Sequence, residues 1–375
     1  MKALFLVFHG FAPYNGISKK ITYQMSAFEN IGLKIKLCYL MFDENNNQVR
    51  MIDNNRLISY GRGLKAKILK RIEYGCLYNY IIENDIHYVY MRYDHNANPF
   101  TIYFLSRLKS KGVIIDMEIP TFPYDREYDN FGLYDKTTLF IDRIFRKKLS
   151  EYLHRIVTFS DYDVIFGKKT IKISNGIDFS KIKIKKLTKP SNTSINLIGV
   201  ADIHFWHGFD RLVAGLVNYY SRKQNVNVYF HIVGGGIQEE LNKIIDIVKT
   251  GNLENYVIFH GPLWGEDLDD IFDKSDFGIA SLARHRSAIT KIKTLKSREY
   301  AARGIPFMYS EIDDDFENMP YIIKAIPDES AIDINSIVEF CFNNKFDPQE
   351  IRASIEGKLS WENQMKIVVD EVHNK

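Results

Sequence analysis

The segment TLKSREYAARGIP, residues 294–306, places a cation and a carboxylate on one face of an expected helix. Lys296 and Glu299 are three residues apart, so their side chains stand one helical turn from each other. We expect the helix to begin near Thr294 and to end at Gly304, a residue suited to the left-handed turn past a helix end. The free N–H groups of a helix N-terminus attract phosphate. The segment could therefore bind a diphosphate through Lys296 and a sugar hydroxyl through Glu299.

Each of these features also has a purely structural interpretation. Glu299 could pair with Arg303, four residues later, on the surface of the helix. Arg284 and Arg286 in the preceding loop could hold a diphosphate through their guanidinium groups, or they could be exposed loop cations. The segment alone leaves these alternatives open.

Two glycine-containing loops follow expected strands. In FHGFAPYNGISKK, Asn15 and Gly16 belong to a tight loop whose backbone N–H groups could approach a phosphate, and Ser18 can cap the next helix. The second loop, VGGGIQEEL, does not fit the G-x-G-x-x-G pattern of dinucleotide-binding proteins. No acidic residue ends the next strand, VIFHG, where one would bind the ribose. We therefore expect no dinucleotide at this second loop.

The chain lacks a convincing set of metal ligands. A D-x-D motif at the end of a strand would suggest Mn²⁺ or Mg²⁺. The two candidates are poor, because Asp161 and Asp163 look like a helix cap, and Asp267 and Asp269 lie within a helical stretch. The three cysteines are widely spaced, which suggests neither a disulfide framework nor a zinc site. We expect no metal, no other cofactor and no nucleic-acid partner.

Apolar runs alternate with helical patterns along the chain, which at 375 residues is long enough for two domains. Hydrophobic residues make up 45%, and no apolar run reaches the roughly 18 residues that span a bilayer. Repeated β–α units predict an α/β fold with two Rossmann-like, doubly wound domains that face each other across a cleft. The expected strands are LFLVF, KIKLCYL, HYVYMR, VIIDME, RIVTF and TIKIS in the first domain, and INLIGV, VYFHIV, YVIFHG, FGIASL, IPFMYS and YIIKAI in the second.

The two halves of the chain carry opposite charge. Residues 1–192 contain 31 of the 50 basic and 19 of the 47 acidic residues, a net +12, and the remainder carries 19 basic and 28 acidic residues, a net −9. In RGLKAKILKRIEYG, apolar residues interleave with cations at helical spacing, as in a helix that lies on an anionic membrane. The alternative is a solvated face of the first domain. The proposed contact cations are Arg62, Lys65, Lys67, Lys70 and Arg71, over the apolar Leu64, Ile68 and Leu69.

Six segments, taken in order, resemble glycosyltransferases of the GT-B fold, in particular the retaining family four (glycosyl transferases group 1) of bacterial polysaccharide synthesis. They are SNGIDFSKI, INLIGVADIHFWHGFDRL, FHIVGGG, VIFHGPLWGEDLDDIFDKSDFGIASL, LKSREYAARGIPF and SWENQMKIVVDEV. The resemblance covers most of the chain and rests on the order of the motifs rather than on any one of them. It implies an acceptor-side domain at 1–185, a nucleotide-sugar-binding domain at 186–359, and a terminal helix at 360–375 that returns to the first domain.

The resemblance also assigns a donor site. Glu299 matches the glutamate that binds the ribose hydroxyls of the donor, and Lys296 and Arg286 fall near its diphosphate. Gly16 matches a glycine that lets the backbone approach the phosphate. The other donor-side residues lie in matching loops: Asn15, His207, Gly235 and Gly261.

The sequence departs from the family pattern at two places. The glutamate of the first motif, eight residues before the second, falls on Lys291. The arginine and lysine that usually follow the first strand of the second domain fall near Asp202 and at His207. Arg286 and Lys296 are therefore expected to be the main diphosphate partners, with His207 assisting, and the carboxylate normally near the donor sugar is missing from its loop.

The reaction that the resemblance implies is loss of a nucleoside diphosphate from an anomeric carbon, during which negative charge develops on the leaving phosphate. Arg286 and Lys296 could stabilise that charge without a metal. In the first domain, the segment DMEIPTF suggests Glu118 as the residue that contacts the acceptor hydroxyl, with Asp94 and His95 as alternatives.

The sequence thus predicts a glycosyltransferase of the hexosyltransferase type with a glycan or lipid-linked acceptor. We expect a cytoplasmic protein that can lie at the inner face of the cell membrane. Two alternatives stay open. A sugar-nucleotide epimerase of the same fold would need no acceptor, and a non-catalytic partner subunit would bind nucleotide-sugar without turnover.

Overall fold

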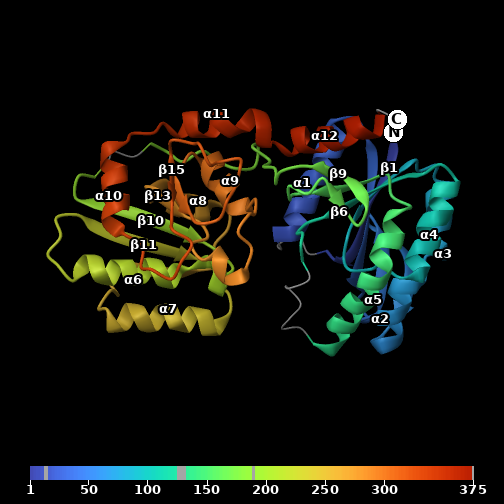
Figure 1. The fold of residues 1–375 in the computed structure, drawn as a ribbon, viewed down its shortest axis with the longest axis horizontal. Coiled ribbons are helices and arrows are strands. Elements are labelled where there is room, and N and C mark those ends of the chain that lie inside the picture. The colour runs from blue at the N-terminus through green and yellow to red at the C-terminus, as the bar shows by residue number, and fades with distance from the viewer. Residues whose placement is uncertain (12–15, 125–131, 188–190, 374–375) are drawn as a thin grey trace. The chain divides into compact units, whose positions relative to one another are not determined.

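The computed structural model describes residues 1–11, 16–124, 132–187 and 191–373. The chain divides into two compact units (Figure 1). The first comprises Met1–Ser174 with Trp361–Lys375, and the second comprises Asn175–Ser360. Each unit is built on one sheet with a parallel centre, which confirms the α/β, doubly wound fold expected from the sequence.

The first unit contains a nine-stranded sheet in the order β4-β3-β2-β1-β5-β6-β7-β9-β8. The six strands expected from apolar runs form its parallel centre, and three further strands, β3, β4 and β8, add antiparallel edges. The strands are β1 (Lys2–Gly10), β2 (Lys34–Phe42), β3 (Gln48–Ile52), β4 (Asn55–Gly61), β5 (Tyr88–Arg92), β6 (Ile114–Ile119), β7 (Arg155–Thr158), β8 (Val164–Ile165) and β9 (Lys168–Lys172).

Both faces of this sheet are buried, because alternate residues of β1 enter different clusters. Leu4 and Leu6 pack with α3, α4 and α5, whereas Phe5 and Val7 pack with α1 and α12. The C-terminal helix α12 therefore belongs to the first unit, where Gln364 accepts a hydrogen bond from the Ser174 amide at 2.6 Å. The helices are α1 (Gly16–Asn30), α2 (Gly63–Ile72), α3 (Gly75–Glu83), α4 (Pro99–Ser110), α5 (Leu133–Ser150) and α12 (Trp361–His373).

The second unit contains a six-stranded parallel sheet in the order β12-β11-β10-β13-β14-β15, which uses the six strands expected from the sequence. Its strands are β10 (Ser194–Val200), β11 (Asn227–Val233), β12 (Val257–Gly261), β13 (Phe277–Ile279), β14 (Phe307–Tyr309) and β15 (Ile322–Lys324). Its helices are α6 (Phe209–Tyr220), α7 (Gln238–Thr250), α8 (Glu266–Lys274), α9 (Leu295–Arg303), α10 (Ile334–Asn343) and α11 (Pro348–Leu359), with short 3₁₀ turns η2 (Phe205–His207) and η3 (Arg284–Ser287).

Helix α9 has the ends expected for it. The Thr294 side chain caps its N-terminus by accepting from the Ser297 amide, and Gly304 ends it in the left-handed conformation, with φ 79°. The fully buried Arg298 ties the helix to the loop that follows β14, where it pairs with Asp313 and Asp315. The N-terminus of α9 is thus held in place by side chains of its own unit.

The first unit ends at Ser174, earlier than the boundary expected at 185/186. The Lys-rich stretch is not a free linker, because the Lys185 amide donates to the Arg303 carbonyl at 2.8 Å and its ammonium donates to the Ser275 carbonyl at 2.6 Å. Its lysines therefore count with the second unit. Divided in this way, the first unit holds 28 basic and 21 acidic residues, a net +7, and the second holds 22 and 26, a net −4.

Candidate functional site

The candidate site of the second unit lies at the carboxyl ends of β10, β13 and β14. The strand order reverses at β10, which has β11 on one side and β13 on the other, and ligands of such sheets bind at this switch point. His207, Arg284 and Glu311 follow the three strands in turn, and each interacts electrostatically with Lys296 of α9. The fold therefore gathers a lysine, an arginine, a histidine and one carboxylate at the switch point.

Lys296 carries a buried ammonium group. Among the described residues, its Nζ atom has no hydrogen-bond partner, and it lies 6.0 Å from the centre of the Phe209 ring. Burial lowers the pKa of Lys296 to about 7, and repulsion from Arg284 adds to this effect, while Glu311 and Asp202 oppose it. An ammonium that is costly to keep charged would gain from an anionic ligand.

Glu311, which the sequence analysis missed, directs a buried carboxylate toward the same place. Its side chain is only 2% exposed, and neither carboxylate oxygen has a hydrogen-bond partner in the described part of the chain. Burial raises the pKa of Glu311 to about 7, against the opposing influence of Arg284, of its own backbone N–H and of Lys296. Within the acidic run SEIDDDF, no pattern of residue types marks this glutamate as different from its neighbours.

His207 is placed as a neutral hydrogen-bond donor. Its ring is 6% exposed, and Nδ1 accepts from the His204 amide at 2.9 Å, so in the neutral ring the proton is on Nε2. Burial, Lys296 and Arg284 hold the pKa of His207 far below its usual range. The expected assisting role of His207 toward a diphosphate remains a prediction, with Nε2–H as the donor.

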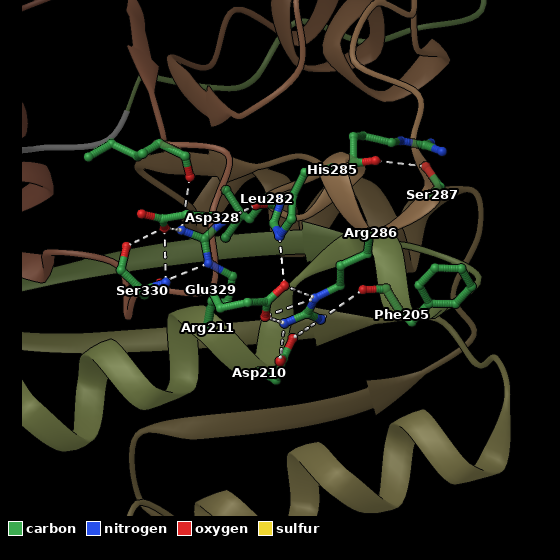
Figure 2. Close-up of polar contacts among 12 residues, drawn as sticks. Phe205, Asp210, Arg211, Leu282, His285, Arg286, Ser287, Asp328, Glu329 and Ser330 are labelled. Carbon is green, nitrogen blue, oxygen red and sulfur yellow. Dashed lines mark hydrogen bonds and ion pairs between the residues drawn. The ribbon is translucent and has the colours of Figure 1, made fainter.

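Arg286 lies in a cage of carboxylates rather than facing an open site (Figure 2). Its guanidinium donates to both carboxylate oxygens of Asp210 at 3.0 and 2.8 Å, to Glu329 at 2.5 to 3.1 Å, and to the Phe205 carbonyl at 2.9 Å. These hydrogen bonds raise its pKa further above its usual value. The structure therefore does not support Arg286 as a diphosphate partner, because all its N–H groups face protein acceptors.

Arg284, at the other end of the same turn, is the arginine that faces Lys296. Its guanidinium lies 5.4 Å from the centre of the Trp206 ring. It influences the pKa values of Lys296, His207 and Glu311. The turn η3 thus separates two similar arginines into different environments.

Glu299 forms the structural pair that was the alternative interpretation of α9. Its carboxylate accepts from Arg303 at 3.0 Å, and Arg303 also donates to Asp269 at 2.7 Å. The Glu299 side chain is 30% exposed, so the pair leaves part of it open to solvent. Contact between Glu299 and a ribose remains a prediction.

The predicted donor glycines lie in loops that pack closely. Gly234 and Gly236 allow the loop after β11 to lie against the loop after β10, because a Cβ atom would come within 1.8 Å of the Ala201 carbonyl oxygen and 2.3 Å of the Ile203 backbone. Gly235 lies between them, and Gly261 accepts from the Gly234 amide at 2.8 Å. Gly16 begins α1 in the first unit, with no atom of the described residues within 4 Å of its missing Cβ, and Asn15 is outside those residues.

Glu118 does not have the position expected of an acceptor-contacting residue. It is fully buried on β6, where its carboxylate accepts from Gln24 at 2.6 Å, from the Tyr90 hydroxyl at 2.7 Å and from Arg92. Burial would raise its pKa, but Lys20 and Arg92 lower it overall. Glu118 is therefore a structural centre of the first unit, and its proposed contact with an acceptor is corrected.

Asp94 and His95 directly follow β5 and are half-buried. His95 has a positive φ of 48° and packs its ring edge-on against Tyr124, with 4.5 Å between ring centres. Asp94 lies close enough to Lys70 to affect its pKa. Both residues stand near the carboxyl end of β5, and their acceptor role remains a prediction.

Helix α2 exposes part of the surface predicted to contact a membrane. Arg62, Lys65 and Lys67 are exposed, as are Leu64 and Ile68. Lys70 and Arg71 are half-buried, and Leu69 packs against the cluster that contains Leu40, Tyr60 and Ala66. The three outer cations, with two apolar side chains, form the solvent-facing part.

Within the described ranges, no group of three or more His, Cys, Asp or Glu side chains is arranged to hold a metal ion. No helix of the described chain is both long and apolar enough to cross a bilayer.

Neither a family model nor a curated protein matches the sequence. Solved structures do match the fold across its length. Sucrose-phosphate synthase from Thermosynechococcus elongatus has a TM-score of 0.69 at 15% identity, covering 100% of this chain and 99% of that chain. Anabaena HepE in complex with UDP has a TM-score of 0.62 at 13% identity, covering 100% of both chains. The apo lipopolysaccharide outer core galactosyltransferase WaaB has a TM-score of 0.64 at 13% identity, covering 100% and 99%. The chain therefore has the GT-B fold of these glycosyltransferases.

Proposed function

We propose that the protein is a glycosyltransferase of the hexosyltransferase type, which moves a sugar from a nucleotide-sugar to a glycan or lipid-linked acceptor in surface polysaccharide synthesis. The observation that carries the proposal is the buried ammonium of Lys296, which has no hydrogen-bond partner in the described part of the chain and lies near Arg284 and His207 at the switch point of a GT-B sheet. In support, HepE was crystallised with UDP-glucose, and starch synthase IV from Arabidopsis thaliana with ADP and acarbose.

The proposed residues suit the charge that develops in such a transfer. The bond from the anomeric carbon to the diphosphate oxygen breaks, and the acceptor oxygen bonds to that carbon. In a retaining reaction the acceptor proton passes to the departing phosphate oxygen on the same face. Lys296 and Arg284 would stabilise the negative charge of the leaving group, and the Nε2–H of His207 would donate a hydrogen bond to it. These groups could meet the electrostatic demand without a metal.

The proposal predicts acceptor-dependent release of nucleoside diphosphate that persists in EDTA. The enzyme is incubated with UDP-, GDP- and dTDP-sugars, with and without a mixture of glycan and lipid-linked acceptors. We expect release with one donor class, stimulated by acceptor and unchanged by EDTA. Activity lost in EDTA and restored by Mn²⁺ would contradict metal independence. Interconversion of the sugar without acceptor would instead indicate an epimerase, and binding without turnover would indicate a partner subunit.

We also propose that the first unit lies on an anionic membrane surface at the cytoplasmic face, where a lipid-linked acceptor would be. Helix α5 adds to the exposed face of α2, because the Lys67 ammonium lies 5.9 Å from the centre of the Tyr134 ring in the first turn of α5. On α5, Leu133, Phe140 and Ile144 are 86%, 63% and 56% exposed. Lys136, Arg143, Lys147 and Lys148 are exposed on the same helix, which makes α5 an amphipathic element with an apolar and cationic outer face.

Vesicle co-sedimentation tests this surface. Each cation near an anionic membrane contributes on the order of 1 kcal/mol, and salt screens the attraction within about 8 Å. We therefore expect binding to anionic but not neutral vesicles at low salt, and a loss of about tenfold or more after five cations of α2 and α5 are changed to Gln. These five are Arg62, Lys65, Lys67, Lys136 and Lys147.

A control variant carries the same change of charge elsewhere on the first unit. It replaces five exposed lysines by Gln, so its net charge falls as much as that of the first variant. Because its α2 and α5 surface is intact, we expect it to bind vesicles nearly as well as the wild type. Equal binding of wild type to neutral and anionic vesicles, or equal loss in the two variants, would contradict the assigned surface. The control positions are Lys34, Lys36, Lys111, Lys169 and Lys366.

A further inference from the structure

We propose that Glu311 binds hydroxyl groups of the donor sugar and so sets which sugar the enzyme accepts. The inference rests on the proposed function. It concerns the sugar of the donor, since Lys296, Arg284 and His207 are proposed to bind only its diphosphate.

Three buried polar groups at neighbouring strand ends lack partners among the described residues. They are the Ser281 hydroxyl after β13, the Glu311 carboxylate after β14 and the Lys296 ammonium on α9. Ser281 is 0% and Glu311 is 2% exposed. The Ser310 amide donates to the Ser281 carbonyl at 2.9 Å, so Ser281 and the residue before Glu311 are adjacent across the sheet. Ser281 and Glu311 therefore come from neighbouring strand ends, and the electrostatic influence of Glu311 on Lys296 places α9 beside Glu311.

The carboxylate and the ammonium attract each other, since each shifts the pKa of the other, yet no hydrogen bond or ion pair connects them in the described structure. Burying a charge without a partner is costly, and native proteins rarely do so without a function. Direct contact would have satisfied both groups. Their separation leaves each one available to a polar ligand.

The chemistry of the groups orients that ligand. An ionised carboxylate only accepts hydrogen bonds, so Glu311 would bind hydroxyl groups and repel phosphate. Lys296, Arg284 and the Nε2–H of His207 would bind the diphosphate. A diphosphate that carries a sugar would suit both places. Its sugar hydroxyls would lie at Glu311 and its phosphates at the three other residues.

The backbone beside Glu311 pairs with the loop in which the family resemblance would place a glutamate. Ile312 pairs with the loop at Lys291: its amide donates to the Thr290 carbonyl at 2.8 Å, and its carbonyl accepts from the Ile292 amide at 3.1 Å. Lys291 forms an ion pair with Asp314 at 2.7 Å. Where the family resemblance leads one to expect a glutamate, this loop carries a cation directed to Asp314, and the Glu311 carboxylate on the adjoining segment has no hydrogen-bond partner among the residues that the structure describes.

The test compares two ligands on wild type and Glu311→Gln by calorimetry: the nucleoside diphosphate, and the same diphosphate carrying its sugar. We expect the variant to bind the nucleoside diphosphate as well as the wild type or better, because it loses a negative charge. Its affinity for the nucleotide-sugar should fall about tenfold to a hundredfold, as for loss of a charged hydrogen bond. Its melting temperature without ligand should be no lower than that of the wild type, because a neutral amide costs less to bury than a carboxylate.

Asp314→Asn is the matched control, since it removes a nearby carboxylate that has a protein partner, and it should leave the ratio of the two affinities unchanged. An unchanged ratio in Glu311→Gln, or a clear drop in its melting temperature with equal losses for both ligands, would overturn the inference. A wild type that binds the nucleotide-sugar only as well as the nucleoside diphosphate would also overturn it. If the wild type binds neither ligand, the proposed function fails as well.

Discussion

Lys296→Ala is expected to lower kcat by about 10²–10³-fold while the protein stays folded. A single preorganised donor to the charge that develops in a transition state contributes this much in other enzymes. Because the Lys296 ammonium is buried and no described residue hydrogen-bonds to it, its removal should not destabilise the free protein. Steady-state kinetics with the preferred donor, combined with thermal melting, measure both effects.

Lys293→Ala is the matched control, because it removes the same charge from the segment just before α9. We expect its kcat to stay within about threefold of wild type. A Lys296→Ala enzyme that keeps wild-type turnover would remove Lys296 from the proposed machinery. A fall in kcat together with loss of the folded state would mean that the lysine supports structure instead.

Arg298→Ala is expected to destabilise the second unit by about 3–5 kcal/mol, the cost of removing one partner from a buried ion pair. Arg298 is 0% exposed and donates to Asp313 at 2.6 and 3.0 Å and to Asp315, and both carboxylates are themselves buried. The variant leaves Asp313 without its charged partner inside the protein. Urea unfolding followed by circular dichroism measures the change.

Lys186→Ala provides a contrasting control, since its ion pair with Asp273 at 2.9 Å lies on the surface with the lysine 80% exposed. Such pairs contribute about 0–1 kcal/mol. If Arg298→Ala unfolds at the same urea concentration as Lys186→Ala, the buried pairs do not hold α9 in place as described.

The parallel core of the fold could be predicted from the sequence because its strands are short apolar runs between helical patterns. All twelve such runs are strands in the structure. The hairpin of β3 and β4 was not predicted, since QVRMI and NRLISYG mix polar and apolar residues and join through a tight turn in which Asp53 has a positive φ of 50°. Edge strands of this kind are specified by their neighbours in the sheet more than by their own pattern.

The site was predicted less completely than the fold, because the direction of each side chain decides which residues belong to the site. Arg284 and Arg286 are two residues apart in the same basic loop, and only the turn η3 sends one toward Lys296 and the other into the carboxylates of Asp210 and Glu329. Glu118 occupies a strand that is buried at every position after Ile114, so it lies inside the first unit whichever face it is on. Glu311 became visible only when its burial and its missing partners were known.

The most direct test of the central claim is a calorimetric titration of UDP, GDP and dTDP, each beside its monophosphate, into wild type and Lys296→Ala. The claim is that the switch point of the second unit binds the diphosphate of a nucleotide-sugar through Lys296. We predict that the wild type binds one diphosphate at least tenfold more tightly than its monophosphate, and that Lys296→Ala loses this preference. Equal binding of the diphosphate and the monophosphate by the wild type, or a preference that survives in Lys296→Ala, would contradict the claim.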